Sequence, residues 1–274
     1  MMDSGLNFSL LCRTNEPEVP LLVHVPHGST VIPDGARRGS LLNDQELEVE
    51  LLKMTDWFTE ELSDHALALG GMMFVNRLSR LVIDPERFPN DAEEVMADRG
   101  MGAVYTKTSD GRPLRHEGPT AERQTLLARY FEPYARAMTE AVGRILQQHG
   151  RCLILDAHSF PSSPLPYEPD QVSPRPDICV GTNAFHTPDS LTEAIEELCA
   201  SSGVVTARNK PFAGTYVPLQ FWREDARVAS LMIEIRRDLY MDERTGQKSG
   251  GFSRTHSLLN KLTELLRDFI CKAV

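Results

Sequence analysis

The sequence predicts an α/β fold in which helices cover both faces of a sheet. Short apolar runs typical of buried strands alternate with amphipathic stretches along most of the chain. Strands buried on both faces need a helical layer on each side, which favours a three-layer α/β/α arrangement. The 274 residues contain no internal repeat and no low-complexity linker, so we expect a single domain spanning 1–274.

The first half of the chain combines strand-like runs with one helix and one long irregular segment. Asn43 and Glu46 can form a capping box that starts the helix, and Gly70 follows its end. Long irregular segments in compact domains are usually functional or disordered. In order, we expect a strand at 20–25, a helix at 43–68, strands at 72–76 and 81–83, and an excursion at 88–118.

The second half continues the alternation and ends in an amphipathic helix. Pro133 lies inside a long helical pattern, where proline bends the helix or ends it. In order, we expect a helix at 120–148, a strand at 152–155, a proline-rich loop at 160–176, a strand at 177–180, a helix at 188–201, strands at 204–206 and 231–235, and a helix at 253–272.

Composition narrows the classes of function. The net charge of −10 provides no overall attraction to nucleic acid or to an anionic membrane, and the basic stretches lack interleaved aromatic residues. There is no run of 18 apolar residues and no basic segment followed by an apolar one at the N-terminus. The five cysteines form no CxxC motif. We therefore expect a cytoplasmic protein without nucleic-acid or membrane partners.

Polar residues gather at the predicted strand ends, where ligands bind in open α/β sheets. These residues are His27, Asp84, His158 and Glu234. Two histidines and a carboxylate are a common ligand set for zinc. Each histidine alone is also compatible with a structural role, and His24, in mid-strand, is expected to pack against a helix.

The third metal ligand is less clear than the two histidines. Asp56 is the preferred candidate, because aspartate is a poor helix former and this one lies among apolar neighbours in the predicted helix. A solvated helix face is the alternative explanation. Asp156 and Asp84 remain possible ligands, and Asp156 could instead orient His158, since residues i and i+2 of a strand point the same way.

Glu234 lies in a buried-type strand, where burial would raise its pKa toward the range of a general base. Pairing with the neighbouring arginines is the structural alternative. Arginine binds carboxylates in a bidentate fork, and three arginines occur close to Asp84. They could hold an acidic substrate or make ordinary salt bridges. The arginine candidates are Arg80 as a catalytic residue, and Arg77, Arg87 and Arg236 as substrate-binding residues.

Together these residues resemble the N-formylglutamate amidohydrolase family, from about Pro20 to Glu243. One segment, IDPERFPND, differs from relatives that read DLNR, and Arg87 would replace their arginine. The segments that carry the resemblance are VPHGSTVIP (25–33), TDWFTEEL (55–62), NRLSRLVIDPERFPND (76–91), MGAVYTKTSDGRPLR (101–115), LDAHSFPSSPLP (155–166), DICVGT (177–182), PFAGTYVPL (211–219) and MIEIRRDLYMDE (232–243).

The resemblance implies a mixed, twisted sheet like that of zinc carboxypeptidases and aminoacylases. It implies hydrolysis of N-formyl-L-glutamate to formate and L-glutamate in histidine degradation. By position, it implies zinc bound by His27, Asp56 and His158, with Glu234 as the catalytic glutamate. Other divalent transition metals also suit such ligands.

Two alternatives stay open. The first is a zinc deacylase of another N-acyl amino acid, or a carboxypeptidase-like hydrolase of γ-glutamyl bonds. The second is a non-catalytic binding protein for an acidic metabolite. No GxSxG, Walker A or dinucleotide-binding motif supports other chemistry. The sequence does not specify the oligomeric state.

Overall fold

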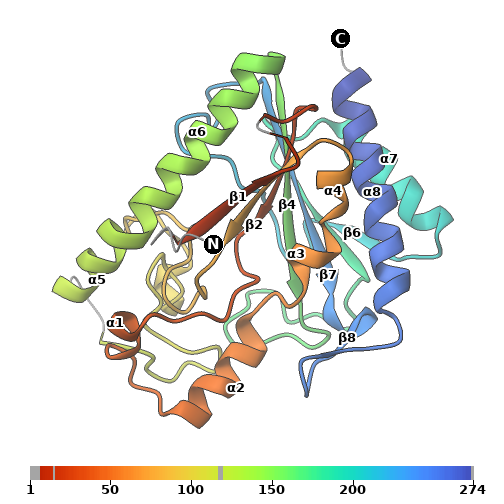
Figure 1. The fold of residues 1–274 in the computed structure, drawn as a ribbon. Helices are drawn as coiled ribbons and strands as arrows, with labels where there is room; N and C mark the ends of the chain where they lie inside the picture. Colours follow the sequence, from red (N-terminus) through yellow and green to blue (C-terminus); the bar gives the residue numbers. More distant parts are fainter. Residues whose placement is uncertain (1–6, 15, 117–119, 273–274) are drawn as a thin grey trace.

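A mixed sheet of seven strands is the middle layer of the computed structural model, which describes residues 7–14, 16–116 and 120–272 (Figure 1). The strand order is β1-β3-β2-β4-β7-β5-β6. Strands β3, β2, β4 and β7 are parallel to one another, while β1 and β5 run antiparallel to their neighbours β3 and β7. The strands are β1 (Phe8–Cys12), β2 (Leu21–Val25), β3 (Met72–Asn76), β4 (Cys152–Phe160), β5 (Ile178–Gly181), β6 (Thr206–Arg208) and β7 (Val228–Arg236), with a separate pair β8 (Met241–Asp242) and β9 (Gln247–Lys248).

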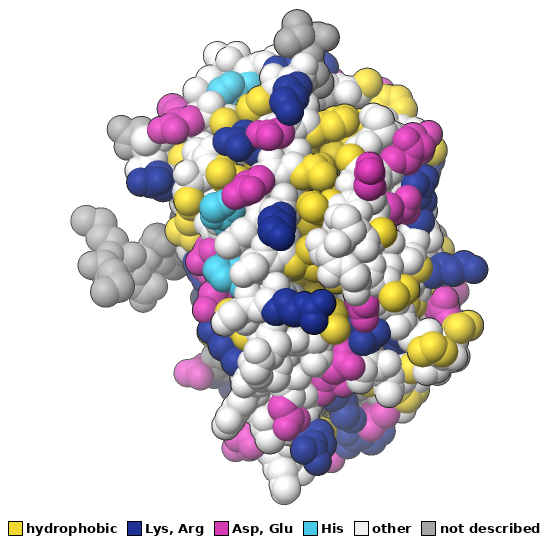
Figure 2. All heavy atoms as spheres, turned by 90° about the vertical axis from the view of Figure 1, so that its right-hand side faces the viewer, with side chains coloured by type: hydrophobic (Ala, Val, Ile, Leu, Met, Phe, Trp, Pro, Cys, Tyr) yellow, Lys and Arg dark blue, Asp and Glu magenta, His cyan; other side chains and the backbone are white. Residues whose placement is uncertain are grey.

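Helices cover both faces of the sheet, as predicted (Figure 1). Alternate strand residues point to opposite sides, so Leu21 and Val23 pack beneath α3, α4, α7 and α8, whereas Leu22 packs beneath α6. On the outer surface that carries α7 and α8, acidic and basic side chains are interspersed (Figure 2). The helices are α1 (Asp34–Arg37), α2 (Asp44–Met54), α3 (Thr59–Leu62), α4 (His65–Ala68), α5 (Ala121–Leu126), α6 (Glu132–His149), α7 (Asp189–Ser201) and α8 (Phe252–Lys272).

The predicted helix at 43–68 is the main correction. Its capping box is present, but α2 ends at Met54 and two short helices follow. Thr55 adopts an extended conformation, and the Asp56 amide donates to the carbonyl of His27 at 3.0 Å. Phe58 then takes a left-handed conformation with φ 64°. A contact with the end of β2 therefore interrupts a segment whose apolar periodicity favours a continuous helix.

The apolar run at 81–83 is not a strand. Its residues are buried, but their backbone forms turns, with the amides of Val82 and Ile83 donating to Ser79. Residues of a loop that are buried in the protein core produce the same apolar run in the sequence as a buried strand. The 88–118 excursion is irregular as expected, apart from the 3₁₀ turn η1 (Ala97–Arg99) and an isolated bridge; its residues 117 and 118 lie outside the described residues.

The long helix predicted at 120–148 contains a π-helical turn, η2 (Leu127–Phe131), immediately before Pro133. A wider turn removes the need for an ordinary helical hydrogen bond near the proline, whose nitrogen has no proton. Strand β1 was not predicted, and β6 begins two residues later than expected. Within the described residues, no helix combines the length and apolar character needed to cross a bilayer.

Candidate active site

Adjacent parallel strands bring the predicted site residues together at one edge of the sheet. His27 follows β2 by two residues, and His158 and Glu234 are direct cross-strand partners on β4 and β7. All three are buried, with at most 8% of each residue exposed. The carboxyl ends of neighbouring parallel strands meet at the same edge, which is why residues more than 200 positions apart become neighbours.

Three ligand-type atoms converge at this edge. The Nδ1 atoms of His27 and His158 lie 3.2 Å apart, and the Oδ2 atom of Asp56 lies 3.1 Å from the nitrogen of His158 and 3.6 Å from that of His27. Asp56 reaches this position because its amide is bonded to the His27 carbonyl. The aspartate predicted to lie within a helix therefore lies in the break between α2 and α3.

The opposite ring nitrogens of both histidines are held by other carboxylates. His27 Nε2 lies 2.9 Å from Asp84 Oδ1, and His158 Nε2 lies 3.0 Å from Asp156 Oδ1. If these nitrogens carry the protons, both Nδ1 atoms present lone pairs to the Asp56 oxygen. Three lone pairs this close repel one another unless a cation lies between them, and carboxylate–histidine pairs of this kind are typical of metal sites. The residues present thus fit a divalent metal ion.

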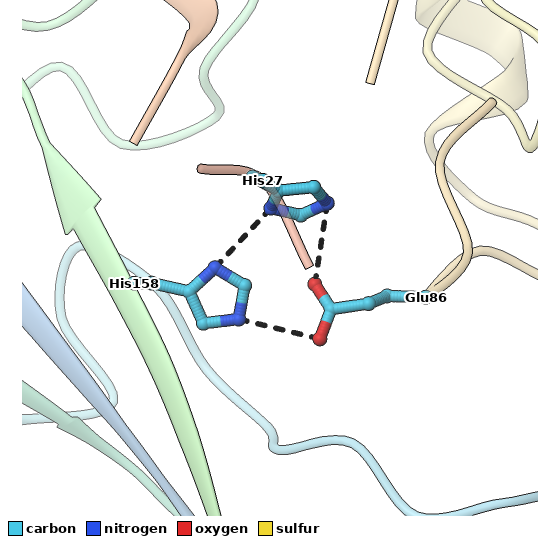
Figure 3. A group of neighbouring side chains, drawn as sticks. All are labelled: His27, Glu86 and His158. Carbon is cyan, nitrogen blue, oxygen red and sulfur yellow. Dashed lines mark hydrogen bonds and ion pairs between the residues drawn. The ribbon is translucent and has the colours of Figure 1, made fainter. Parts of the chain in front are cut away.

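Glu86, which was not among the predicted site residues, also faces both histidines (Figure 3). Its carboxylate oxygens lie 3.2 Å from His158 Nε2 and 3.5 Å from His27 Nε2. His27, Glu86 and His158 therefore form an alternative ligand group. Glu86 must share both nitrogens with the better placed Asp84 and Asp156, so the Nδ1 side with Asp56 is the stronger candidate. No sequence pattern separated Glu86 from the other acidic residues of its segment.

The electrostatics of the cluster favour a bound cation. Burial alone would lower the pKa of His158, but Glu86, Asp156 and Asp56 outweigh it and hold that pKa well above its usual value. Burial alone would raise the pKa of Asp56, but hydrogen bonds from both histidines and the charge of Arg237 hold it below its usual range. The carboxylates therefore stabilise positive charge between the imidazoles, whether it is carried by protons or by a metal.

Glu234 is held differently from the other carboxylates. Burial raises its pKa to about 7, and its Oε2 atom has no hydrogen-bond partner among the described residues. The nearby positive charges of His158, Arg80 and Arg237 only partly offset this effect. A buried carboxylate without a partner is costly unless it acts on something else. Glu234 lines a cavity of about 560 Å³ that also contains His27 and His158.

The structure sorts the arginine candidates. Arg80 and Arg87 line the cavity, but Arg77 and Arg236 do not. Arg77 forms a two-pronged pair with Glu60 on α3, at 2.7 and 3.0 Å, and Arg236 pairs with acidic residues on the outside of β7. Side-chain direction at the ends of β3 and β7 decides this outcome. Of the three residues predicted to bind substrate, Arg87 is therefore brought to the cavity, and Arg77 and Arg236 are not.

The arginines that line the cavity differ in their hydrogen-bond partners. Arg237 donates to Asp56 Oδ1 at 2.8 Å and to Ser159, so it holds the candidate ligand. Arg80 donates to Tyr105 and Asp84, both at 2.9 Å. The buried Nε atom of Arg87 has no hydrogen-bond partner among the described residues. Its ion pairs with Asp84 and Glu94 are longer than hydrogen bonds, at 3.6 and 3.9 Å, so Arg87 is a candidate for binding an anion.

His24 contacts a helix, as expected, and also supports the cluster. Its Nε2 atom lies 2.6 Å from the hydroxyl of Tyr134 on α6, and its Nδ1 atom lies 3.0 Å from Asp156 Oδ1. The second Asp156 oxygen accepts from the Tyr216 amide at 2.9 Å. A fully buried chain of hydrogen bonds therefore runs from α6 to His158.

In comparison with known proteins, the family model and the two relatives described here agree on one family. The family model described as N-formylglutamate amidohydrolase matches residues 19–241. The chain is 30% identical to an N-formylglutamate deformylase of Pseudomonas aeruginosa, covering 97% of each chain. It is 29% identical to one from Pseudomonas putida, covering 88% of this chain and 87% of the other.

Solved structures show the same fold. An N-formylglutamate amidohydrolase from Ralstonia eutropha superimposes with a TM-score of 0.84 at 27% identity, covering 98% of this chain and 99% of the other. A gene product from Agrobacterium tumefaciens superimposes with a TM-score of 0.70 at 18% identity, covering 96% of each chain.

Proposed function

The chain belongs to the N-formylglutamate amidohydrolase family, and we propose that this amidohydrolase cleaves N-formyl-L-glutamate with the help of zinc, giving formate and L-glutamate. The relatives named as N-formylglutamate deformylases support the substrate. The observation that carries the mechanism is the convergence of His27 Nδ1, His158 Nδ1 and Asp56 Oδ2 beside Glu234, whose Oε2 atom has no hydrogen-bond partner in the described part of the chain.

His27, His158 and Asp56 would hold the metal ion. When bound, a divalent metal lowers the pKa of water and polarises a carbonyl group. Asp84 and Asp156 keep each imidazole in the tautomer whose Nδ1 lone pair points inward, and Arg237 keeps one Asp56 oxygen turned toward the histidines. The donor set suits zinc, and it also tolerates cobalt, nickel or manganese.

Glu234 would act as the general base and then as the acid. Its carboxylate accepts a proton from the attacking water while the water oxygen forms a bond to the formyl carbon. Glu234 then delivers that proton to the amide nitrogen as the carbon–nitrogen bond breaks, so the amine leaves neutral. Its pKa of about 7 lies near neutral pH, where proton acceptance and donation are both efficient.

The cavity arginines would stabilise negative charge. Arg80 lines the cavity and has donors besides those used for Tyr105 and Asp84, which suits it to the developing oxyanion. Arg87 lines the cavity and makes only long ion pairs with Asp84 and Glu94, at 3.6 and 3.9 Å, so it would bind a substrate carboxylate. We place the reaction in histidine degradation and in the cytoplasm, following the resemblance to the family.

Formate release from N-formyl-L-glutamate tests this proposal. The purified protein would be assayed as prepared, after chelation and after restoring zinc. Release that is lost on chelation and returns with zinc is the expected result. Zinc bound in a folded protein without formate release would contradict the proposed substrate, whereas unchanged release after complete metal removal would contradict the proposed metal dependence.

A further inference from the structure

A second cavity adjoins the candidate active site. Its volume is about 520 Å³, and Glu86, Arg87, Thr215, Tyr216 and Trp222 line both cavities. Glu86 itself contacts His158 at 3.2 Å. The junction of the two cavities therefore lies beside His158.

The second cavity, called here the side chamber, differs in chemistry from the catalytic cavity. Its buried lining residues include Phe131, Val217 and Pro218. Of its charged residues, Arg136 and Glu140 lie on the exposed side of α6, at the rim, and Glu86 and Arg87 lie where it adjoins the catalytic cavity. The catalytic cavity, by contrast, contains Arg80, Arg237, His27 and other charged residues. An uncharged group is thus better accommodated in the part of the side chamber lined by Phe131, Val217 and Pro218.

We propose that the side chamber is an acyl subsite, so that the enzyme also hydrolyses N-acyl-L-glutamates with acyl groups larger than formyl. This inference rests on the proposed function, because it assumes that the arginines hold the glutamate carboxylates. The scissile amide then separates a charged half, which faces the arginines, from an uncharged acyl half. A formyl group ends at its carbonyl carbon and would leave the side chamber unused.

Acyl length should therefore improve binding until the chamber is filled. Each buried CH₂ group strengthens binding by roughly fourfold. The chamber volume of about 520 Å³ is ample for an aliphatic or aromatic acyl group. The hydrolysis is the same for every acyl group: water adds to the carbonyl carbon, the carbon–nitrogen bond breaks, and the amine takes a proton.

The test compares N-formyl-, N-acetyl-, N-butyryl- and N-benzoyl-L-glutamate by release of glutamate, the product they share. Thr139 lines the chamber from α6, whereas Gln147 is exposed on the same helix outside the chamber. T139W should lower kcat/KM for the benzoyl substrate by roughly tenfold or more and leave formyl turnover nearly unchanged. Q147W should change neither. A135F fills the same chamber from a second position, so the test does not depend on T139W folding correctly.

The outcomes separate this inference from the proposed function. The acyl subsite is overturned if the enzyme hydrolyses only the formyl substrate and the substrates with longer acyl groups are neither hydrolysed nor inhibitory. That result leaves the deformylase proposal standing. Turnover of longer substrates without formyl turnover, sensitive to T139W, supports the subsite and overturns the proposed substrate. Equal losses on formyl and benzoyl substrates in folded T139W and A135F overturn the subsite, and so does a lack of turnover on every substrate.

Discussion

His27 and His158 face each other through their Nδ1 atoms at 3.2 Å, although 131 positions separate them in the sequence. Asp56 Oδ2 completes the triangle on one side, and Glu86 lies against the Nε2 atoms on the other. Two sets of ligands are therefore distinguishable by experiment, because they use different carboxylates.

The first prediction concerns the metal ligand. D56N should lose most bound zinc, because it removes the charge of the oxygen that faces both Nδ1 atoms, whereas E86Q should retain it. Zinc content by elemental analysis and affinity by competition with a chelator measure the difference. The reverse result, zinc lost in E86Q and kept in D56N, would assign the third ligand to Glu86.

The second prediction concerns Glu234. E234Q should retain its metal and lose kcat by roughly 10²–10⁴-fold, the range usual for a missing general base. The exposed Glu224, changed to glutamine, provides a matched control that should leave kcat unchanged. Near wild-type turnover in E234Q, with normal zinc content, would remove Glu234 from the mechanism.

The third prediction concerns pH. Glu234 accepts a proton only when it is ionised, so kcat/KM should fall as pH decreases through the pKa of its carboxyl. Burial raises that pKa to about 7, and a bound cation nearby shifts it back toward acid. The acidic limb should thus lie at or below about pH 7. It should disappear from the residual activity of E234Q, and a limb of the same midpoint in that variant would assign it to another group.

The fourth prediction compares two arginines. R87A should raise KM for N-formyl-L-glutamate by roughly 10–100-fold, the effect of losing a hydrogen bond between charged groups, and should affect an N-formyl neutral amino acid much less. R77A provides the control, because its guanidinium is paired with Glu60 outside the cavity. Equal effects of R87A on both substrates would indicate a structural arginine.

The fifth prediction concerns His24, whose Nδ1 atom lies 3.0 Å from the same Asp156 oxygen that contacts His158. H24A should weaken zinc binding by roughly 10–100-fold, because Asp156 would hold His158 less firmly. Y134F leaves the imidazole in place and should have a smaller effect. The measurement is zinc affinity. A substitution that lowered only the folding stability would not alter the zinc affinity of the folded protein. Unchanged affinity in folded H24A would exclude this positioning role.

Local patterns in the sequence were sufficient for the layers of the fold and for part of the site. Strand β4 is a run of buried residues, and α8 has amphipathic periodicity over its whole length. His27, His158 and Glu234 were found because each lies near the end of such a strand. These features depend on neighbours in the chain, so the sequence shows them directly.

The tertiary structure decided what the chain pattern leaves open. The bond from the Asp56 amide to His27 ended a helix that periodicity continued, and so moved Asp56 into the cluster. The direction of the Arg77 side chain after β3 took it out of the cavity, whereas the irregular segment that follows left Arg87 in it. The sequence determined which residue types were present and which elements carried them. Packing between distant segments determined which of those residues met, because distances of about 3 Å between residues far apart in the chain depend on the arrangement of the whole sheet and its helices.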